Sequence, residues 1–208
     1  MESVGEAPHD PDLFSLAGHT LEERYRIDRV VAEGGFGVVY DAWHLGLDFR
    51  VAVKVLKTPD DMTENARTLF IEKCVAEAKV MARMSHAHIV RVIDTGVSEM
   101  PAGRRAPWMA MEWLSGRTLQ LWFEETGAQP PERVLALLQP VLEAIAYAHD
   151  EGVAHRDIKP ENIMLVETKR GPWPRVLDFG IAKLMREGEN AGSGVTKTQS
   201  RSSAFSPA

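Results

Sequence analysis

The sequence predicts an α+β fold with a strand-rich first part and a mainly helical second part. Short segments rich in apolar and β-branched residues are typical of strands. The expected strands cover residues 25–31, 38–40, 51–54, 89–93 and 108–113. Apolar residues at helical spacing indicate helices over 66–84 and 131–150, and the capping residues Thr118 and Gly127 indicate a shorter one between them. A chain of 208 residues suits one such domain, or one domain and part of another.

Composition restricts the partners and the compartment that we expect. The 24 basic and 30 acidic residues give a net charge of −6, which does not favour a nucleic-acid or anionic membrane surface. The single cysteine, Cys74, cannot form an internal disulfide, so a reducing compartment is expected. The sequence has no basic start followed by an apolar core, and no apolar run of roughly 18–20 residues. We therefore expect a cytoplasmic location, with no signal peptide and no membrane segment.

A glycine cluster at residues 32–37 lies between two expected strands. Such a cluster alone is weak support for a ligand site, because tight turns use the same residues. A dinucleotide-binding turn needs a helix after the glycines, and here a strand follows them. The pattern therefore favours a hairpin flap over phosphates, in which Gly34 and Gly37 let backbone amides approach them.

Lys54 ends an otherwise apolar strand, Val51-Ala52-Val53. Lysine is rarely buried without a partner, so a buried Lys54 requires one. The strand alone slightly favours the alternative that Lys54 faces solvent from an edge strand. With the glycine flap just before it, Lys54 becomes a candidate to bind the α- and β-phosphates of a nucleotide.

The segment 155–162 and the residue Asp178 combine groups that suit phosphoryl transfer. The carboxylate of Asp157 can accept the proton of an attacking hydroxyl group, and Lys159 can neutralise charge that develops on the phosphoryl group. Asn162 and Asp178 offer oxygen ligands to Mg²⁺. His155 could also be read as a general base, so its role is open at this point.

Together these motifs resemble those of the eukaryotic-like serine/threonine protein kinases of bacteria. The resemblance extends from Tyr25 to Ala208 and includes the flap, Lys54, the segment 155–162 and Asp178-Phe179-Gly180. It implies a protein-kinase-like fold of two lobes. Residues 21–115 would form an antiparallel sheet with one helix, and residues 116–208 an incomplete, mainly helical second lobe. Residues 1–20 would be a flexible leader, although Leu13, Phe14 and Leu16 could dock.

The resemblance also implies roles in the binding of ATP. Glu77 would pair with Lys54, Met111 would be the gatekeeper, and the backbone of residues 112–114 would form the hinge that pairs with adenine. The implied ATP-binding residues are Ala32, Glu33, Gly34, Gly35, Phe36, Gly37, Val39, Ala52, Lys54, Met111, Glu112, Leu114 and Met164. Ala32 stands where the family has its first glycine. We expect ATP binding to be retained, because a methyl group there is minor when φ is negative.

Further roles follow from the same resemblance. His155 would stack on Phe179 and join the lobes, which favours a structural role over a general base. Arg156 would bind the phosphate of a phosphorylated activation segment, matched by residues 181–208. The candidate phosphorylation sites are Thr196, Thr198, Ser200, Ser202 and Ser203. The expected partners are proteins with serine or threonine side chains, including a second copy of the chain in autophosphorylation in trans.

The last residues, Ser206-Pro207-Ala208, resemble those just before the Ala-Pro-Glu element of the family. We therefore expect a kinase domain truncated before that element, and the isolated chain to phosphorylate proteins poorly. The alternative is a nucleotide-binding or interaction module without turnover. The apolar stripe of the helix 131–150 is interpreted as core, with part of its cover missing. It comprises Val134, Leu135, Leu138, Val141, Leu142 and Ile145.

Overall fold

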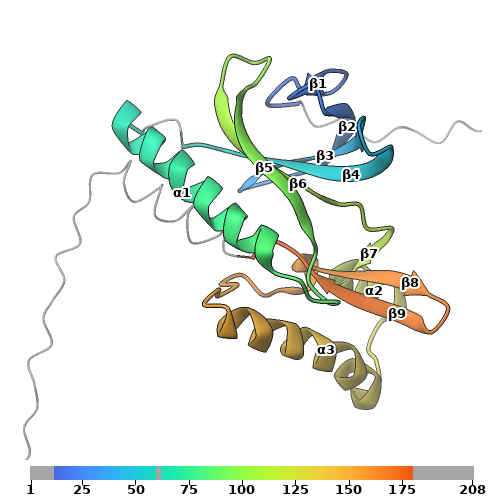
Figure 1. Ribbon diagram of the computed structural model, residues 1–208. Coiled ribbons are helices and arrows are strands. Elements are labelled where there is room, and N and C mark those ends of the chain that lie inside the picture. The colour runs from blue at the N-terminus through green and yellow to red at the C-terminus, as the bar shows by residue number, and fades with distance from the viewer. Residues whose placement is uncertain (1–11, 60–61, 180–208) are drawn as a thin grey trace, which may run out of the picture.

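The computed structural model of the protein describes residues 12–59 and 62–179. It confirms the predicted α+β fold in two lobes, each with its own antiparallel sheet (Figure 1). The upper lobe has a six-stranded sheet and one long helix, α1 (Glu64–Arg83). The lower lobe has a three-stranded sheet and two α-helices. No helix in the described ranges is long and apolar enough to cross a bilayer.

The upper sheet has the strand order β1-β2-β3-β4-β6-β5. Its strands are β1 (Thr20–Leu21), β2 (Tyr25–Gly34), β3 (Gly37–His44), β4 (Phe49–Leu56), β5 (Val92–Glu99) and β6 (Arg105–Glu112). The helix α1 runs across β5 and β6 (Figure 1). Alternate residues of β6 belong to different cores: Met109 and Met111 pack with α1, whereas Trp108 and Ala110 pack in a second cluster. The upper sheet is therefore covered on both faces.

Residues 12–19, here called the N-terminal strap, supply part of that second cluster. Phe14 and Leu16 are only 1% and 2% exposed and pack with β-strand residues such as Tyr40. Asp12 fixes the strap, because it accepts hydrogen bonds from the hydroxyl group of Tyr40 at 2.5 Å and from the amide of Ala17 at 2.7 Å. The structure thus differs from the flexible leader that we expected through residue 20 and agrees with the alternative that Phe14 and Leu16 dock. Residues 12–19 belong to the upper core, and residues 1–11 lie outside the described residues.

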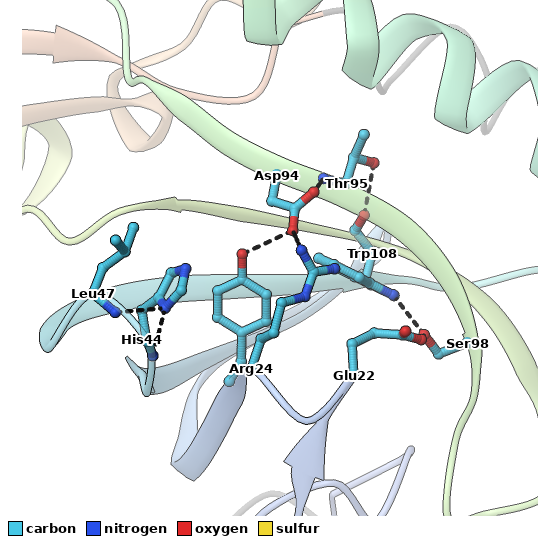
Figure 2. A network of polar contacts seen from close by, with 10 residues as sticks. Glu22, Arg24, His44, Leu47, Asp94, Thr95, Ser98 and Trp108 are labelled. Carbon is cyan, nitrogen blue, oxygen red and sulfur yellow. Dashed lines mark hydrogen bonds and ion pairs between the residues drawn. The ribbon is translucent and has the colours of Figure 1, made fainter.

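A polar network joins the start of β2 to the far strand β5 (Figure 2). Asp94 accepts a hydrogen bond of 2.9 Å from the hydroxyl group of Tyr25. Ser98 accepts one of 2.7 Å from the indole of Trp108 and donates to Glu22. These bonds satisfy the polar ends of two buried aromatic residues, so the aromatic rings can remain in the core at little cost.

The lower lobe begins with β7 (Gly116–Thr118) and α2 (Leu119–Thr126). It continues with α3 (Pro131–Asp150), the 3-10 turn η1 (Pro160–Asn162), β8 (Ile163–Thr168) and β9 (Gly171–Val176). The capping residues predicted for α2 are confirmed. The hydroxyl oxygen of Thr118 accepts from the amide of Leu121 at 3.1 Å, and Gly127 ends the helix with a φ of +68°.

The helix α3 has the predicted ends, but its buried face is narrower than predicted and turned relative to it. The fully buried residues are Leu137, Val141, Ala144 and Ala148. From the predicted stripe only Val141 is among them, and Leu135 and Leu142 are 66% and 67% exposed. The helix packs on β9 through the stripe that begins at Leu137. Leu138 and Ile145 are half-buried beside that stripe, and Leu135 and Leu142 are left exposed.

Residues 84–91, here called the linker, connect α1 to β5 and bind to the lower lobe. The amide of Val90 donates to the carbonyl oxygen of Val176 at 2.9 Å. The amide of Val176 in turn donates to the carbonyl oxygen of His88 at 2.8 Å. The His88 ring stacks on Trp173 at 4.3 Å. The strand predicted at residues 89–93 therefore begins only at Val92, because β9 takes the backbone hydrogen bonds of the linker.

Candidate active site

One face of the upper sheet collects five of the predicted ATP-binding residues. Ala32 pairs with Val39 between β2 and β3, and Val39 pairs with Lys54 between β3 and β4. Ala52 pairs with Met111 between β4 and β6. Residues directly opposite each other, and residues two apart in a strand, share one face of a sheet. The register therefore places these five side chains on one surface, the surface that we expect to hold a nucleotide.

The glycine cluster forms a hairpin, as predicted. Gly34 pairs with Gly37, and Gly35-Phe36 make the turn between β2 and β3. A Cβ atom on Gly37 would lie 2.3 Å from the carbonyl oxygen of Val55, so glycine is needed there for the close approach of β4. A Cβ on Gly34 or Gly35 would meet no atom within 4 Å. Only the tip of the flap therefore has open space beside its backbone.

Two other flap residues have a clear structural setting. Ala32 is not among the described residues with positive φ, so its methyl group is tolerated without strain, as expected. The carboxylate of Glu33 forms an ion pair of 2.7 Å with Lys57, just beyond the end of β4. The amide of Lys57 also donates to the carbonyl oxygen of Phe36 at 3.1 Å. The flap is thus tied to the strand that carries Lys54.

Lys54 is buried and paired, which rules out the solvent-facing alternative. It is 5% exposed, and its Nζ lies 2.7 Å from Oδ2 of Asp178. The partner differs from the one expected: Glu77 is half-buried on α1 and forms no ion pair with Lys54 among the described residues. Asp178 has left-handed backbone geometry, with φ of +56°, and its carboxylate takes the place of Glu77 beside Lys54.

The catalytic-loop candidates cluster around one carboxylate. Oδ2 of Asp157 accepts a hydrogen bond of 3.0 Å from the side chain of Asn162 and lies 3.2 Å from Nζ of Lys159. Burial raises the pKa of Asp157, but the hydrogen bonds from Lys159 and Asn162 and the charge of Lys159 outweigh it. The pKa therefore lies below the ordinary aspartate value, and Asp157 is ionised at neutral pH.

His155 is buried and is bound through both of its ring nitrogen atoms. It is 2% exposed, and its ring meets Phe179 edge-on at 4.6 Å, rather than stacking on it as we expected. Nε2 lies 2.6 Å from the carbonyl oxygen of Leu177, and Nδ1 accepts from the amide of Asp157 at 3.3 Å. A neutral ring with its proton on Nε2 satisfies both contacts. Burial lowers the pKa of His155, against the opposing effects of Leu177 and nearby carboxylates.

This setting predicts a loss of stability in acid. The pKa of His155 is lower in the folded than in the unfolded chain, so the unfolded chain binds more protons below about pH 6.5. The free energy of unfolding should therefore fall as the pH drops below that value. In His155→Phe this dependence should be weaker, whereas in the exposed control His149→Phe it should persist. Part of the pH dependence should remain in His155→Phe, because the pKa of His86 is also lowered by burial. Urea unfolding at pH 5 to 8 measures it, and an unchanged slope in His155→Phe would contradict the assignment.

Asn162 and Asp178 fit a Mg²⁺ ion. The amide nitrogen of Asn162 donates to the backbone and side-chain oxygens of Asp157 at 2.8 and 3.0 Å, so its Oδ1 faces no donor among the described residues. Asp178 binds Lys54 through Oδ2, which leaves its other oxygen. Mg²⁺ prefers such hard oxygen ligands and keeps few of them from the protein. The described residues hold no cluster of three or more His, Cys, Asp or Glu suited to a metal.

The predicted hinge follows the end of β6. Met111 lines a small apolar cavity together with Phe179 and Met81 of α1. Glu112 binds Arg175 of β9, a contact that our sequence reasoning missed. The signal was present, because Arg175 is a lone charge next to Val176-Leu177, as Lys54 is a lone charge in its strand. Gly180 and the candidate phosphorylation sites at 196–203 lie outside the described residues.

Most of the chain is similar to known proteins. The family model for the protein kinase domain matches residues 25–206. The serine/threonine-protein kinase pkn3 of Myxococcus xanthus is 36% identical over 175 residues, which are 84% of this chain and 30% of that protein. PknA of Mycobacterium tuberculosis is 38% identical over 166 residues, 80% of this chain and 37% of that protein. The crystal structure of the PknI kinase domain of Mycobacterium tuberculosis superimposes with a TM-score of 0.62 at 32% identity.

The fold has the two lobes that the sequence predicted, each with its own sheet. The chain belongs to the protein kinase family. It covers about a third of the length of the two bacterial kinases named above, and 62% of the PknI kinase domain. The N-terminal strap precedes the part that the family model matches.

Proposed function

We propose that this chain transfers the γ-phosphoryl group of ATP to serine and threonine hydroxyl groups of proteins. The observation that carries the proposal is the ionised carboxylate of Asp157, held between Lys159 and Asn162. The loop that holds it is bonded to the segment that follows β9 and contains Asp178, because the amide of Leu177 donates to the carbonyl oxygen of Asn162 at 2.9 Å. Asp178 in turn forms an ion pair with Lys54. The proposed proton acceptor, Asp157, and the proposed phosphate-binding residue, Lys54, are thereby connected through one segment.

In the proposed mechanism the protein acts by positioning and by charge. Asp157 orients the substrate hydroxyl group and accepts its proton as the new P–O bond forms and the bond to the β-phosphate oxygen breaks. Lys159 lies beside the transferred group and stabilises its negative charge, and each ~1.4 kcal/mol of such stabilisation gives a factor of ten in rate. Mg²⁺, held by Asn162 and Asp178, would neutralise the phosphates.

Lys54 would bind the α- and β-phosphates. Its present partner is Asp178, whose carboxylate is also the expected metal ligand. If the carboxylate of Asp178 held the metal, Lys54 would need another carboxylate as its partner, and we propose Glu77 on α1 for this role. The adenine would lie between Val39 and Ala52 above and Met164 below. The backbone of residues 112–114 would bind its edge.

The nucleotide site is tested by its effect on stability. Mg·ATP at about 100 times its dissociation constant should add roughly 2.7 kcal/mol to the free energy of unfolding. Lys54→Met should abolish most of this gain, because the phosphates lose their buried cation. The matched control is Lys169→Met, since Lys169 is exposed in the turn between β8 and β9. Thermal unfolding with and without Mg·ATP measures the gain. An equal gain in stability in wild type and Lys54→Met would show that Lys54 does not bind the nucleotide. No gain in wild type would contradict the proposal.

A further inference from the structure

Arg175 joins three segments that belong to two lobes. Its Nη2 forms an ion pair with Oε1 of Glu112, at the end of β6, and donates to the carbonyl oxygen of Ile89 at 2.8 Å. The same carboxylate oxygen accepts from the backbone amide of Arg91 at 2.6 Å. The side chains of Arg175 and Glu112 are 17% and 30% exposed. One guanidinium group therefore holds β9, the hinge and the linker together where water screens the charges only in part.

Both ends of this ion pair lie next to proposed nucleotide-binding residues. Arg175 is directly opposite Met164 between β9 and β8, so their side chains share one face of the lower sheet. Asp178 follows Arg175 by three residues. The residue before Asp178 donates a backbone hydrogen bond of 2.9 Å to the carbonyl oxygen of Asn162. Glu112, at the other end, is the first residue of the hinge. The ion pair between Arg175 and Glu112 thus connects the hinge to the sheet formed by β8 and β9.

We propose that Arg175 is a positioning residue for the nucleotide: through Glu112 it fixes the separation between the hinge and two strands, β8, which carries Met164, and β9, which leads to Asp178. This inference rests on the function proposed above, because the nucleotide would lie between the hinge and the strands β8 and β9. An arginine suits the role, since its planar group can bind a carboxylate and a carbonyl oxygen at once. Without the Arg175 side chain, nucleotide binding itself must fix the hinge relative to the strands β8 and β9, so the affinity for the nucleotide falls.

The test measures nucleotide affinity separately from turnover. Arg175→Met should weaken the binding of a non-hydrolysable Mg·ATP analogue by about tenfold, and Arg175→Lys should weaken it less. The KM for ATP should rise in parallel, while kcat at saturating ATP changes by less than about threefold. If the two side chains act as one unit, the double variant Arg175→Met, Glu112→Met should bind no more weakly than Arg175→Met alone.

A matched control is Arg117→Met. Arg117 also bridges two carboxylates, with Glu167 at 3.0 Å and Glu125, but all three residues lie in the lower lobe. Its removal should leave nucleotide affinity unchanged. A wild-type chain that binds no nucleotide would contradict the proposed function itself. A wild-type chain that binds, with Arg175→Met and Arg175→Lys variants that are folded and bind equally well or turn over faster, would overturn the positioning role alone.

Discussion

Replacement of Asp157 by asparagine is expected to slow phosphoryl transfer by about 10²- to 10⁴-fold, the usual contribution of a positioned general base. Asparagine keeps an oxygen that can accept the hydrogen bond from Asn162, so the loop should retain its shape. It loses the negative charge that Lys159 now faces at 3.2 Å, and it cannot take a proton from a hydroxyl group. Nucleotide affinity should change by less than about threefold, because Asp157 contacts the transferred group rather than the adenine side.

The measurement is phosphate transfer from Mg·ATP to a serine-containing protein, with analogue binding measured on the same samples. Asp150→Asn is the matched control, because Asp150 ends α3 on the exposed surface. Its transfer rate should equal that of wild type. If Asp157→Asn transfers phosphate within tenfold of wild type while Asp150→Asn does the same, Asp157 is not the base. If wild type binds the analogue but transfers nothing, the chain acts as a binding module.

The parts of the site that the sequence predicted well are those whose chemistry lies in consecutive residues. The flap was predicted because a glycine cluster between two strands requires a hairpin, and β2 and β3 form one. Lys54 was predicted from its place just after the glycine flap, although its strand alone slightly favoured a solvent-facing lysine, and it is buried. Asp157 and Asn162 lie five residues apart, so the short loop itself brings their side chains together. Local geometry decided these features.

The features that the sequence did not predict depend on contacts between distant residues. The partner of Lys54 is Asp178, and it depends on how β9 ends beside the upper sheet. The late start of β5 depends on the linker binding to β9. The ion pair between Arg175 and Glu112 joins residues 63 positions apart. Periodicity in one segment cannot report which face another segment covers, so the sequence did not show that the most buried line of α3 begins at Leu137.

The N-terminal strap gives the second large expected effect, because it was predicted to be flexible and is part of the core. Phe14→Ala should lower the free energy of unfolding by about 3–5 kcal/mol, the usual loss when a buried phenylalanine is truncated. The side chain is 1% exposed and packs under the same sheet that carries Lys54. Since the whole stability of a domain is about 5–15 kcal/mol, this one change would remove a large fraction of it. Urea unfolding, followed by tryptophan fluorescence, measures the loss.

The control for this experiment is Leu47→Ala. Leu47 lies in the turn between β3 and β4, has a similar apolar side chain, and is 61% exposed. Its replacement should cost less than about 0.5 kcal/mol, as for most surface positions. Equal small losses in both variants would show that the strap does not belong to the core. A large loss in Phe14→Ala alone would mean that the upper sheet, and with it Lys54 and the flap, depends on residues that precede the part matched by the kinase family. A variant that starts at Tyr25 would then fold poorly even though it keeps every predicted site residue.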